Sequence, residues 1–190
     1  MSESESGREA VAVVLDFLPH GRAEDDRPQY QKEPVAYALT ESDFRLLELT
    51  LEKETSVGIG DSIPVDPPEA RENIQKLHEI GYSDLTSASQ SELEHAVVDI
   101  VERDEERFVN FYNDAQPITL RLHQLNLLPG IGKKLRNNVL EARKRQPFES
   151  FDDLEDRVSG LHKPQDVLVE RILEEIREDD LKYRTFARRD

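Results

Sequence analysis

Residues 127–136 read Leu-Leu-Pro-Gly-Ile-Gly-Lys-Lys-Leu-Arg, a Gly-x-Gly turn followed at once by cations. Glycine has no Cβ, so backbone N–H groups at such a turn can approach a ligand closely. A helix that begins just after Gly132 would add unpaired N–H groups and the positive end of its dipole. Lys133, Lys134 and Arg136 would add full charges. The stretch therefore predicts an anion site, with nucleic-acid phosphate as the leading ligand. A helix-to-helix turn that uses glycine only for its geometry is the alternative.

The charge distribution favours this site, although the composition opposes it. The 190 residues include 25 basic and 41 acidic ones, a net charge of −16, and such a chain should repel a polyanion. Residues 121–145, however, contain seven basic residues and one acid, so this window carries +6 and the other 165 residues carry −22. A positively charged segment therefore lies within an otherwise acidic chain.

Adaptation to salt explains the acidity. Seventeen arginines against eight lysines, together with the high net charge, favour a surface that holds its hydration in concentrated salt. An acidic and partly disordered protein is the alternative, but apolar periodicity persists along the chain. Under the first interpretation, the acidity is an adaptation to a salty solvent and does not indicate the charge of the ligand.

The composition also excludes several classes of protein. The chain has no cysteine, which excludes disulfides and thiolate chemistry. No apolar run approaches the roughly 18 residues of a membrane span. Residues 1–9 are rich in Ser and Glu and lack the apolar core of a signal peptide. We expect a disordered tail at 1–9 and a cytoplasmic protein with neither a membrane partner nor a small-molecule substrate.

The first third of the chain has the pattern of short strands. Strand candidates lie at 11–18, 35–39, 45–51 and 62–65, separated by turn-forming segments. This spacing predicts a small antiparallel barrel or sandwich over residues 10–67. Residues 44–51 could equally be helical on their apolar spacing.

The remainder is expected to be helical, which makes the fold class α+β. Residues 68–80 contain helix formers, with Ile74, Leu77 and Ile80 at a spacing that suits a helix. A clearer apolar stripe runs from Leu93 to Val101 and continues to Tyr112. We expect a helical connector at 68–116, an all-α domain at 117–182 and a basic tail at 183–190. Within the domain, helices are expected at 118–127, 133–145, 151–158 and 164–177, with Ser150 as an N-cap and Pro164 at a first helical position.

The helical domain shows an internal duplication. A helix, a glycine turn and a helix occur twice, about 30 residues apart, at Gly130 and Gly160. The segment 120–145 resembles the helix-hairpin-helix motif, whose apolar-Pro-Gly-apolar-Gly signature stands at 128–132, and residues 147–154 resemble the link of tandem versions. The resemblance implies contacts to phosphates without sequence specificity, and a monovalent cation at the 128–132 hairpin in some members. The second copy, at 159–162, lacks the second glycine.

The wider chain resembles an archaeal family of unknown function, DUF655. The resemblance rests on Val-Val-Leu-Asp-Phe-Leu-Pro at 13–19, Tyr-Gln-Lys-Glu-Pro at 30–34, Ala-Gln-Pro-Ile-Thr at 115–119 and the hairpin itself. Together with the composition it suggests a haloarchaeal member. The resemblance implies an N-terminal barrel similar to an OB fold, a C-terminal helix-hairpin-helix unit and an RNA-binding role, and on the residues themselves we expect no enzymatic activity. Ribosomal or transcription proteins are the implied partners.

Two surfaces supply the candidate nucleic-acid contacts. The first is the hairpin with the helix that follows it, where Arg143 and Lys144 have a competing explanation, since cations are favoured at any helix C-terminus. The second is the loop at 21–32, where a tyrosine could stack on a base and three cations could bind phosphates. In that loop the acids at 24–26 could neutralise the cations internally instead. The candidate residues are Gly130, Ile131, Gly132, Lys133, Lys134, Arg136, Arg143, Lys144, Arg22, Arg27, Tyr30 and Lys32.

The sequence gives little support for catalysis. The five histidines show no metal-ligand spacing. The acids at 152, 153, 155 and 156 could hold Mg²⁺, but such clusters are expected in a chain of this charge, and we expect no metal. RNA is favoured over DNA by the family resemblance. The competing functions are an adaptor for a basic ribosomal or polymerase protein, and a DNA repair or nuclease-associated factor.

Overall fold

The computed structural model describes residues 10–189. The tail expected at 1–9 lies outside these residues. The described chain divides into two compact units, one of residues 10–96 with 186–189 and one of residues 97–185. Helix α1, Ser87–Arg103, contains the division. Each unit is described by itself below. Among residues 10–189, no helix is both long and apolar enough to cross a membrane.

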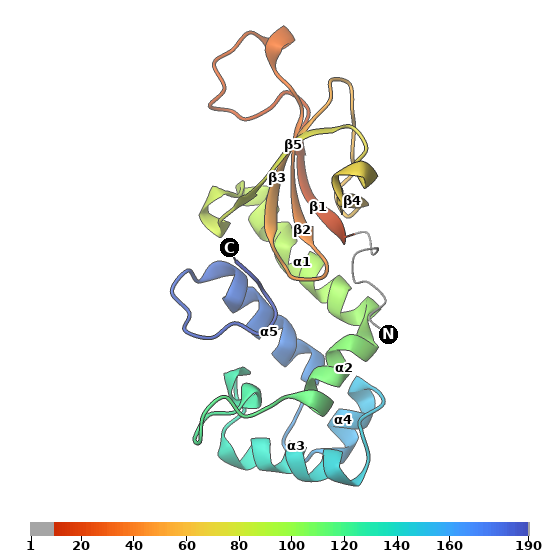
Figure 1. The fold of residues 1–190 in the computed structure, drawn as a ribbon, viewed down its shortest axis with the longest axis vertical. Helices are drawn as coiled ribbons and strands as arrows, with labels where there is room; N and C mark the ends of the chain where they lie inside the picture. The colour runs from red at the N-terminus through yellow and green to blue at the C-terminus, as the bar shows by residue number, and fades with distance from the viewer. Residues whose placement is uncertain (1–9, 190) are drawn as a thin grey trace. The chain divides into compact units, whose positions relative to one another are not determined.

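The first unit is built on a five-stranded antiparallel sheet that curls into a half-barrel. Its strands lie in the order β4-β1-β2-β3-β5, as Figure 1 shows. The four strands predicted from the sequence are confirmed, and the segment that could have been helical forms β3. The sheet is open, because its edge strands β4 and β5 pair with β1 and β3 and not with each other. The strands are β1 Ala10–Leu18, β2 Val35–Thr40, β3 Leu46–Leu51, β4 Ser62–Asp66 and β5 Ile74–Ile80.

Strand β5 corrects the helical connector expected from residue 68 onward, because residues 74–80 pair with β3. The register shifts between Thr50 and Leu51, so that Ile74 lies opposite Leu51 while Lys76 lies opposite Thr50. Ile74 and Leu77 both pack against the core of the sheet. Strict alternation would place two residues three apart on opposite faces. The irregularity at Gln75 places both on one face. Their spacing of three residues in the sequence therefore resembles that of a helix.

The core of the half-barrel consists of small and aliphatic side chains on one face of the sheet. Ala12, Ala36, Ala38 and Leu49 are fully buried in it. Alternation places these side chains inward while their neighbours point to the other face. A register shift in β1 between Val14 and Asp16 lies within its pairing with β2.

Asp16 has a structural role at this shift. One carboxylate oxygen accepts a hydrogen bond from the Thr86 hydroxyl at 2.6 Å, and the other accepts from the Phe17 N–H at 2.9 Å. Thr86 in turn accepts from the Ser89 N–H at 3.1 Å, at the start of α1. Asp16 therefore helps to anchor a helix N-terminus.

The helices largely follow the sequence prediction. The stripe from Leu93 to Val101 is buried, but the long helix expected there is interrupted at Asp104, whose backbone is not helical. The Ser150 hydroxyl caps α4 by accepting from the Asp153 N–H at 2.9 Å, and Pro164 opens α5, both as predicted. The α-helices after α1 are α2 Glu105–Asp114, α3 Lys133–Arg145, α4 Phe151–Arg157 and α5 Pro164–Arg177, and the 3-10 helices are η2 Gln29–Gln31, η3 Pro68–Ala70, η4 Tyr82–Asp84 and η5 Gln124–Leu127.

The helix predicted at 118–127 is wrong over most of its length. Residues 124–127 form the 3-10 helix η5, and residues 117–123 form a tight loop closed by a bridge between Pro117 and His123. The Thr119 hydroxyl accepts from the Leu122 N–H at 3.0 Å. A threonine side chain that bonds nearby backbone groups competes with helix formation in this way. Leu120, an apolar residue within the predicted helix, is fully exposed.

The basic tail expected at 183–190 is bonded to the chain as far as the structure describes it. Arg184 donates to the carbonyl groups of Glu178 and Asp179 beyond the end of α5. The Thr185 N–H donates to the buried Glu175 carboxylate at 2.8 Å. In the first unit, the Arg188 N–H donates to the Asp43 carbonyl at 2.9 Å.

Candidate nucleic-acid interface

The first hairpin joins η5 to α3 through a left-handed glycine. Gly130 has φ +78°, a conformation that side chains rarely adopt. The Ile131 N–H closes the turn by donating to the Leu128 carbonyl at 3.2 Å, and the Ile131 side chain is 4% exposed. The isoleucine therefore anchors the hairpin in the fold, while its backbone neighbours face outward.

Gly132 is the N-cap of α3 and has no structural need to be glycine. Its φ of −86° and ψ of −169° are open to any residue. A Cβ built there would meet no atom within 4 Å. Neither conformation nor packing therefore explains the glycine, whereas a ligand that approaches the backbone closely would. Gly130 differs from Gly132, because its positive φ is sufficient reason for a glycine at that position.

The first turn of α3 offers free donors. No acceptor among the described residues pairs with the N–H groups of Gly132, Lys133 or Lys134. The first turn contains no acidic side chain. Unpaired N–H groups and the helix dipole together create a positive potential at this end. Lys133 and Lys134 are both exposed, so their ammonium groups can add to it.

Asn126 connects the parts of this site, and the sequence analysis missed it. Its carbonyl oxygen accepts from the His123 N–H and from the Arg136 guanidinium, each at 3.1 Å. Its amide nitrogen donates to the Ile131 carbonyl at 3.2 Å. One half-buried side chain thus fixes the start of η5, the hairpin and the first turn of α3. An asparagine three residues before a Pro-Gly turn gives little sequence signal for such a role.

His123 belongs to the fold rather than to the exposed surface. Its ring is 5% exposed, and its Nδ1 accepts from the Leu125 N–H at 3.1 Å. Burial, followed by the positive charges of Arg143 and Arg136, lowers the pKa of His123. The neutral ring that accepts this hydrogen bond is therefore the favoured form.

The two cations predicted near the end of α3 differ in their surroundings. The Arg143 guanidinium donates to the carbonyl groups of Tyr112 at 3.1 Å and Ala115 at 2.9 Å, at the end of α2. Burial lowers the pKa of Arg143. The explanation that the sequence left open concerned the C-terminus of its own helix, α3, whereas the Arg143 guanidinium contacts the C-terminal carbonyl groups of α2. Lys144 is exposed.

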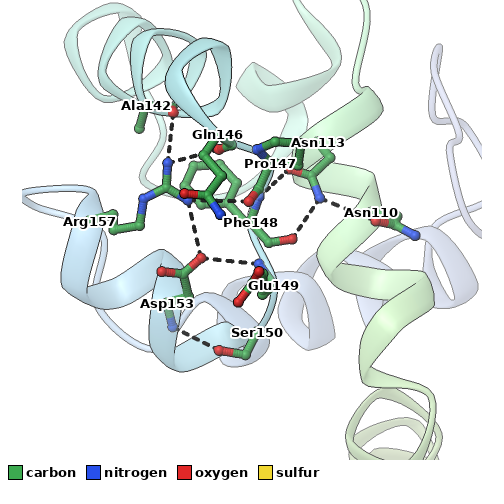
Figure 2. A network of polar contacts seen from close by, with 10 residues as sticks. All are labelled: Asn110, Asn113, Ala142, Gln146, Pro147, Phe148, Glu149, Ser150, Asp153 and Arg157. Carbon is green, nitrogen blue, oxygen red and sulfur yellow. Dashed lines mark hydrogen bonds and ion pairs between the residues drawn. The ribbon is translucent and has the colours of Figure 1, made fainter.

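A polar network fixes the link between α3 and α4, as Figure 2 shows. Arg157 donates to the carbonyl groups of Ala142 at 2.9 Å and Gln146 at 2.8 Å, at the end of α3. The Asn113 side chain brackets Phe148, accepting from its N–H at 2.7 Å and donating to its carbonyl at 3.0 Å. The first hairpin helix and the start of the second copy are therefore held by directed contacts.

The second hairpin repeats the glycine conformation and the closing hydrogen bond of the first, although Lys163 before α5 is left-handed, with φ +46°. Gly160 has φ +92°, and the Leu161 N–H donates to the Val158 carbonyl at 3.2 Å. Leu161 is 1% exposed, as a buried anchor. The difference lies at Lys163, whose N–H donates to the Glu155 carboxylate at 3.2 Å. The chain therefore supplies its own anion at the second hairpin.

In the first unit, the cations predicted at 21–32 are largely paired. Arg22 forms an ion pair with Glu48, a buried carboxylate of β3 that also lies 3.4 Å from His78. The Arg27 guanidinium forms a bidentate ion pair with the Asp25 carboxylate, and these contacts lower the pKa of Asp25 to about 2. The neutralisation by residues 24–26 that the sequence left open thus applies to Arg27, whereas Arg22 is paired with an acid from outside the loop.

Tyr30 and Lys32 lie in the same loop. Tyr30 is 73% exposed, so its ring is available for stacking. Lys32 is half-buried beside the short helix that carries Tyr30. An open hollow of about 740 Å³ lies beside the loop and includes Arg22, Tyr37, Glu48 and His78 in its lining.

The acids of α4 do not gather into a metal site. Asp153 accepts from the Glu149 N–H and from Arg157, each at 3.1 Å, while Glu155 accepts from the Lys163 N–H at the second hairpin. Within residues 10–189, no group of three or more His, Asp or Glu side chains is placed to hold a metal ion.

Comparison with known proteins identifies the family. Residues 8–188 match the family model DUF655, which is described as a protein of unknown function. The chain belongs to the DUF655 family. Its relatives include the uncharacterised protein MJ0038 of Methanocaldococcus jannaschii, 36% identical over 182 residues that cover 95% of this chain and 80% of the relative.

A solved DUF655 structure has the same fold. The crystal structure of Af1531 from Archaeoglobus fulgidus is similar with a TM-score of 0.85 at 39% identity, over 95% of this chain and 100% of that one. A more limited similarity, 33% identity over 60 residues, covers 31% of this chain and 4% of a DNA polymerase III of PolC type from Mycoplasma pneumoniae.

Proposed function

We propose that this DUF655 protein binds RNA by docking one or two consecutive phosphates on the hairpin of residues 128–134. The observation that carries the proposal is the set of unpaired N–H groups at Gly132, Lys133 and Lys134, beside a glycine that the fold does not require. Lys133, Lys134 and Arg136 supply positive charge. Directed N–H contacts keep their value in concentrated salt better than counterion release does, which suits a salt-adapted, haloarchaeal protein.

The proposed architecture is a tandem helix-hairpin-helix unit. Helices η5 and α3 flank the first hairpin, and α4 and α5 flank the second, with matching glycine conformations and closing hydrogen bonds. In this proposal the first copy binds phosphate, and a monovalent cation can be held at residues 128–132. The second copy has a structural role, because Glu155 occupies its Lys163 N–H.

The half-barrel is proposed as an OB-like platform that extends the contact. Tyr30 offers an exposed ring for stacking on a base, with Lys32 close to it in sequence. Arg22 and Arg27 would have to exchange Glu48 and Asp25 for phosphate, which makes them the weaker candidates. Arg143 is weaker than Lys144 for a similar reason.

The preference for RNA over DNA is part of the proposal, and it is carried over from the RNA-binding role that the family resemblance implies. The similarity of a segment to part of a DNA polymerase supports nucleic-acid contact in general. We propose a non-enzymatic, cytoplasmic protein that acts in ribosome biogenesis or transcription, beside ribosomal or transcription proteins.

The test is a binding series with RNA and DNA, single- and double-stranded, over a range of KCl concentrations. Lys133→Glu/Lys134→Glu should weaken binding uniformly and reduce the salt slope by about 1 for each phosphate that the variant no longer binds. Lys76→Glu/Lys182→Glu is the matched control, because it reverses two exposed lysines outside both hairpins. Equal affinity of the first variant and the wild type would overturn the phosphate site. Absence of any nucleic-acid binding by the wild type, with protein partners retained after nuclease treatment, would favour the adaptor.

A further inference from the structure

The loop of residues 117–123 carries a leucine whose side chain is not buried in the protein core. The Leu120 side chain is fully exposed, at 107% of its reference area. Burying a leucine stabilises a protein, and an exposed Leu120 makes no such contribution. Its next neighbour along the chain, Arg121, is also exposed.

The loop keeps its shape without the Leu120 side chain. The N–H groups of Ile118 and Thr119 donate to the Leu122 carbonyl at 2.8 and 2.9 Å. The Thr119 hydroxyl accepts from the N–H groups of Arg121 and Leu122 at 3.3 and 3.0 Å. At its base, Gln116 and Gln124 exchange two hydrogen bonds, at 2.8 and 3.0 Å. The tip is therefore ordered before any ligand arrives.

The loop is attached to the first hairpin through Asn126. That side chain accepts from the His123 N–H, where the loop ends, and contacts Ile131 and Arg136 in the hairpin and α3. Residues 115–140, which include the loop and the hairpin, contain no acidic residue in a chain that has 41. A polyanion that reaches the hairpin therefore meets no opposing carboxylate along this stretch of chain.

We infer that Leu120 is a wedge that enters a base step of a structured RNA while the hairpin holds the phosphate backbone. Apolar side chains that insert between bases unstack them, and this cost is offset by the added contact. Arg121 would bind a phosphate beside the opened step. This inference rests on the proposed function and adds to it that the ligand is a helical or bulged RNA rather than an extended strand.

The experiment uses stem-loop RNAs that carry 2-aminopurine at a bulged step or at a paired step, because unstacking raises its fluorescence. Wild-type protein should raise the signal at one of these steps. Leu120→Ala should abolish the rise and weaken binding about tenfold, with the salt slope unchanged, because the substitution removes no charge. Leu120→Met should restore both. Ile59→Ala, at an exposed aliphatic residue of the other unit, is the matched control.

The outcomes separate the two proposals. If the wild type binds no nucleic acid, the phosphate-binding function fails and the wedge fails with it. If the wild type binds but Leu120→Ala matches it in affinity and fluorescence, the wedge alone is overturned. Weaker binding by Leu120→Ala without any fluorescence rise in the wild type would show surface contact and overturn insertion. Since Leu120 is exposed, thermal unfolding of all variants should match the wild type.

Discussion

The two hairpins of the helical unit share a left-handed glycine and a closing hydrogen bond, but they differ in the backbone that follows and in the acceptor near the helix start. Gly130 and Gly160 are both left-handed, and both turns close with a hydrogen bond of 3.2 Å. In the first, the Lys133 N–H has no acceptor among the described residues, whereas in the second the Lys163 N–H donates to Glu155. Glycine geometry alone therefore does not define an anion site. A free donor beside the turn is also needed.

The difference lies partly in one residue of the preceding helix. Thirty residues separate the two glycines, and at that offset the residue matching Glu155 is Leu125, which is buried. A buried leucine cannot reach the donors as a carboxylate can. Glu155 thus gives the second hairpin an internal anion, and exchanging these features tests whether the first hairpin binds an external one.

The largest effect is expected from Gly132→Asp, which gives the first hairpin its own carboxylate. Aspartate is a favoured N-cap, so the unfolding free energy should rise by a few tenths of a kcal/mol. RNA binding should fall by about a hundredfold, because the added charge repels phosphate at the donors. Binding titrations and thermal unfolding check this. Gly132→Ala tests glycine itself, and undiminished binding by the aspartate variant would contradict the site.

Asn126→Ala should break the network that connects the loop, the hairpin and α3. Three hydrogen bonds disappear and their partners are left without acceptors or donors, so the unfolding free energy should fall by about 2 kcal/mol. Denaturant unfolding measures it. Asn137→Ala, at an exposed amide of α3, is the control. Equal decreases in the two variants would show that Asn126 has no special role.

The sequence predicted the local features of this comparison well. The Gly130 and Gly160 turns, the Ser150 cap and the start of α5 at Pro164 are local patterns, and the structure confirms them. The occupied N–H of Lys163 was not predicted, because the acceptor Glu155 is eight residues away and one of 41 acids.

The errors arose where strand pairing or local side-chain hydrogen bonds override the apolar pattern. Ile74 and Leu77 have helical spacing, but pairing with β3 and an irregularity at Gln75 make the segment a strand. Residues 118–123 are rich in leucine, yet Thr119 hydrogen bonds turn them into a loop. Likewise, Arg143 could be named as a candidate from sequence, but its contacts with Tyr112 and Ala115 depend on how α2 and α3 pack.

Glu155→Ala should move the second hairpin toward the first. Freeing the Lys163 N–H removes one charge-assisted hydrogen bond, so the unfolding free energy should fall by about 1 kcal/mol. RNA affinity should rise about twofold to threefold at low salt, since one carboxylate is removed near an exposed lysine. Calorimetry and binding titrations check both. Glu170→Ala, which removes an exposed charge from α5, is the control, and an equal gain there would indicate net charge alone.

The smallest effect concerns pH. The folded protein lowers the pKa of His123, so the unfolded chain takes up this proton first, near the ordinary value of about 6.5. The contribution to stability is therefore complete above that pH and is lost as the pH falls through the folded pKa. His123→Asn keeps an acceptor for the Leu125 N–H without titrating. Thermal unfolding of this variant should depend less on pH below about 6.5 than that of the wild type, and identical profiles would contradict the assignment.

The most direct measurement is amide mapping by heteronuclear NMR during titration with RNA in concentrated KCl. The N–H signals of Gly132, Lys133 and Lys134 should shift downfield at saturation, while that of Lys163 should stay in place because it already donates to Glu155. Matching shifts at both hairpins, or shifts confined to the half-barrel, would contradict the claim that the free donors of the first hairpin bind phosphate.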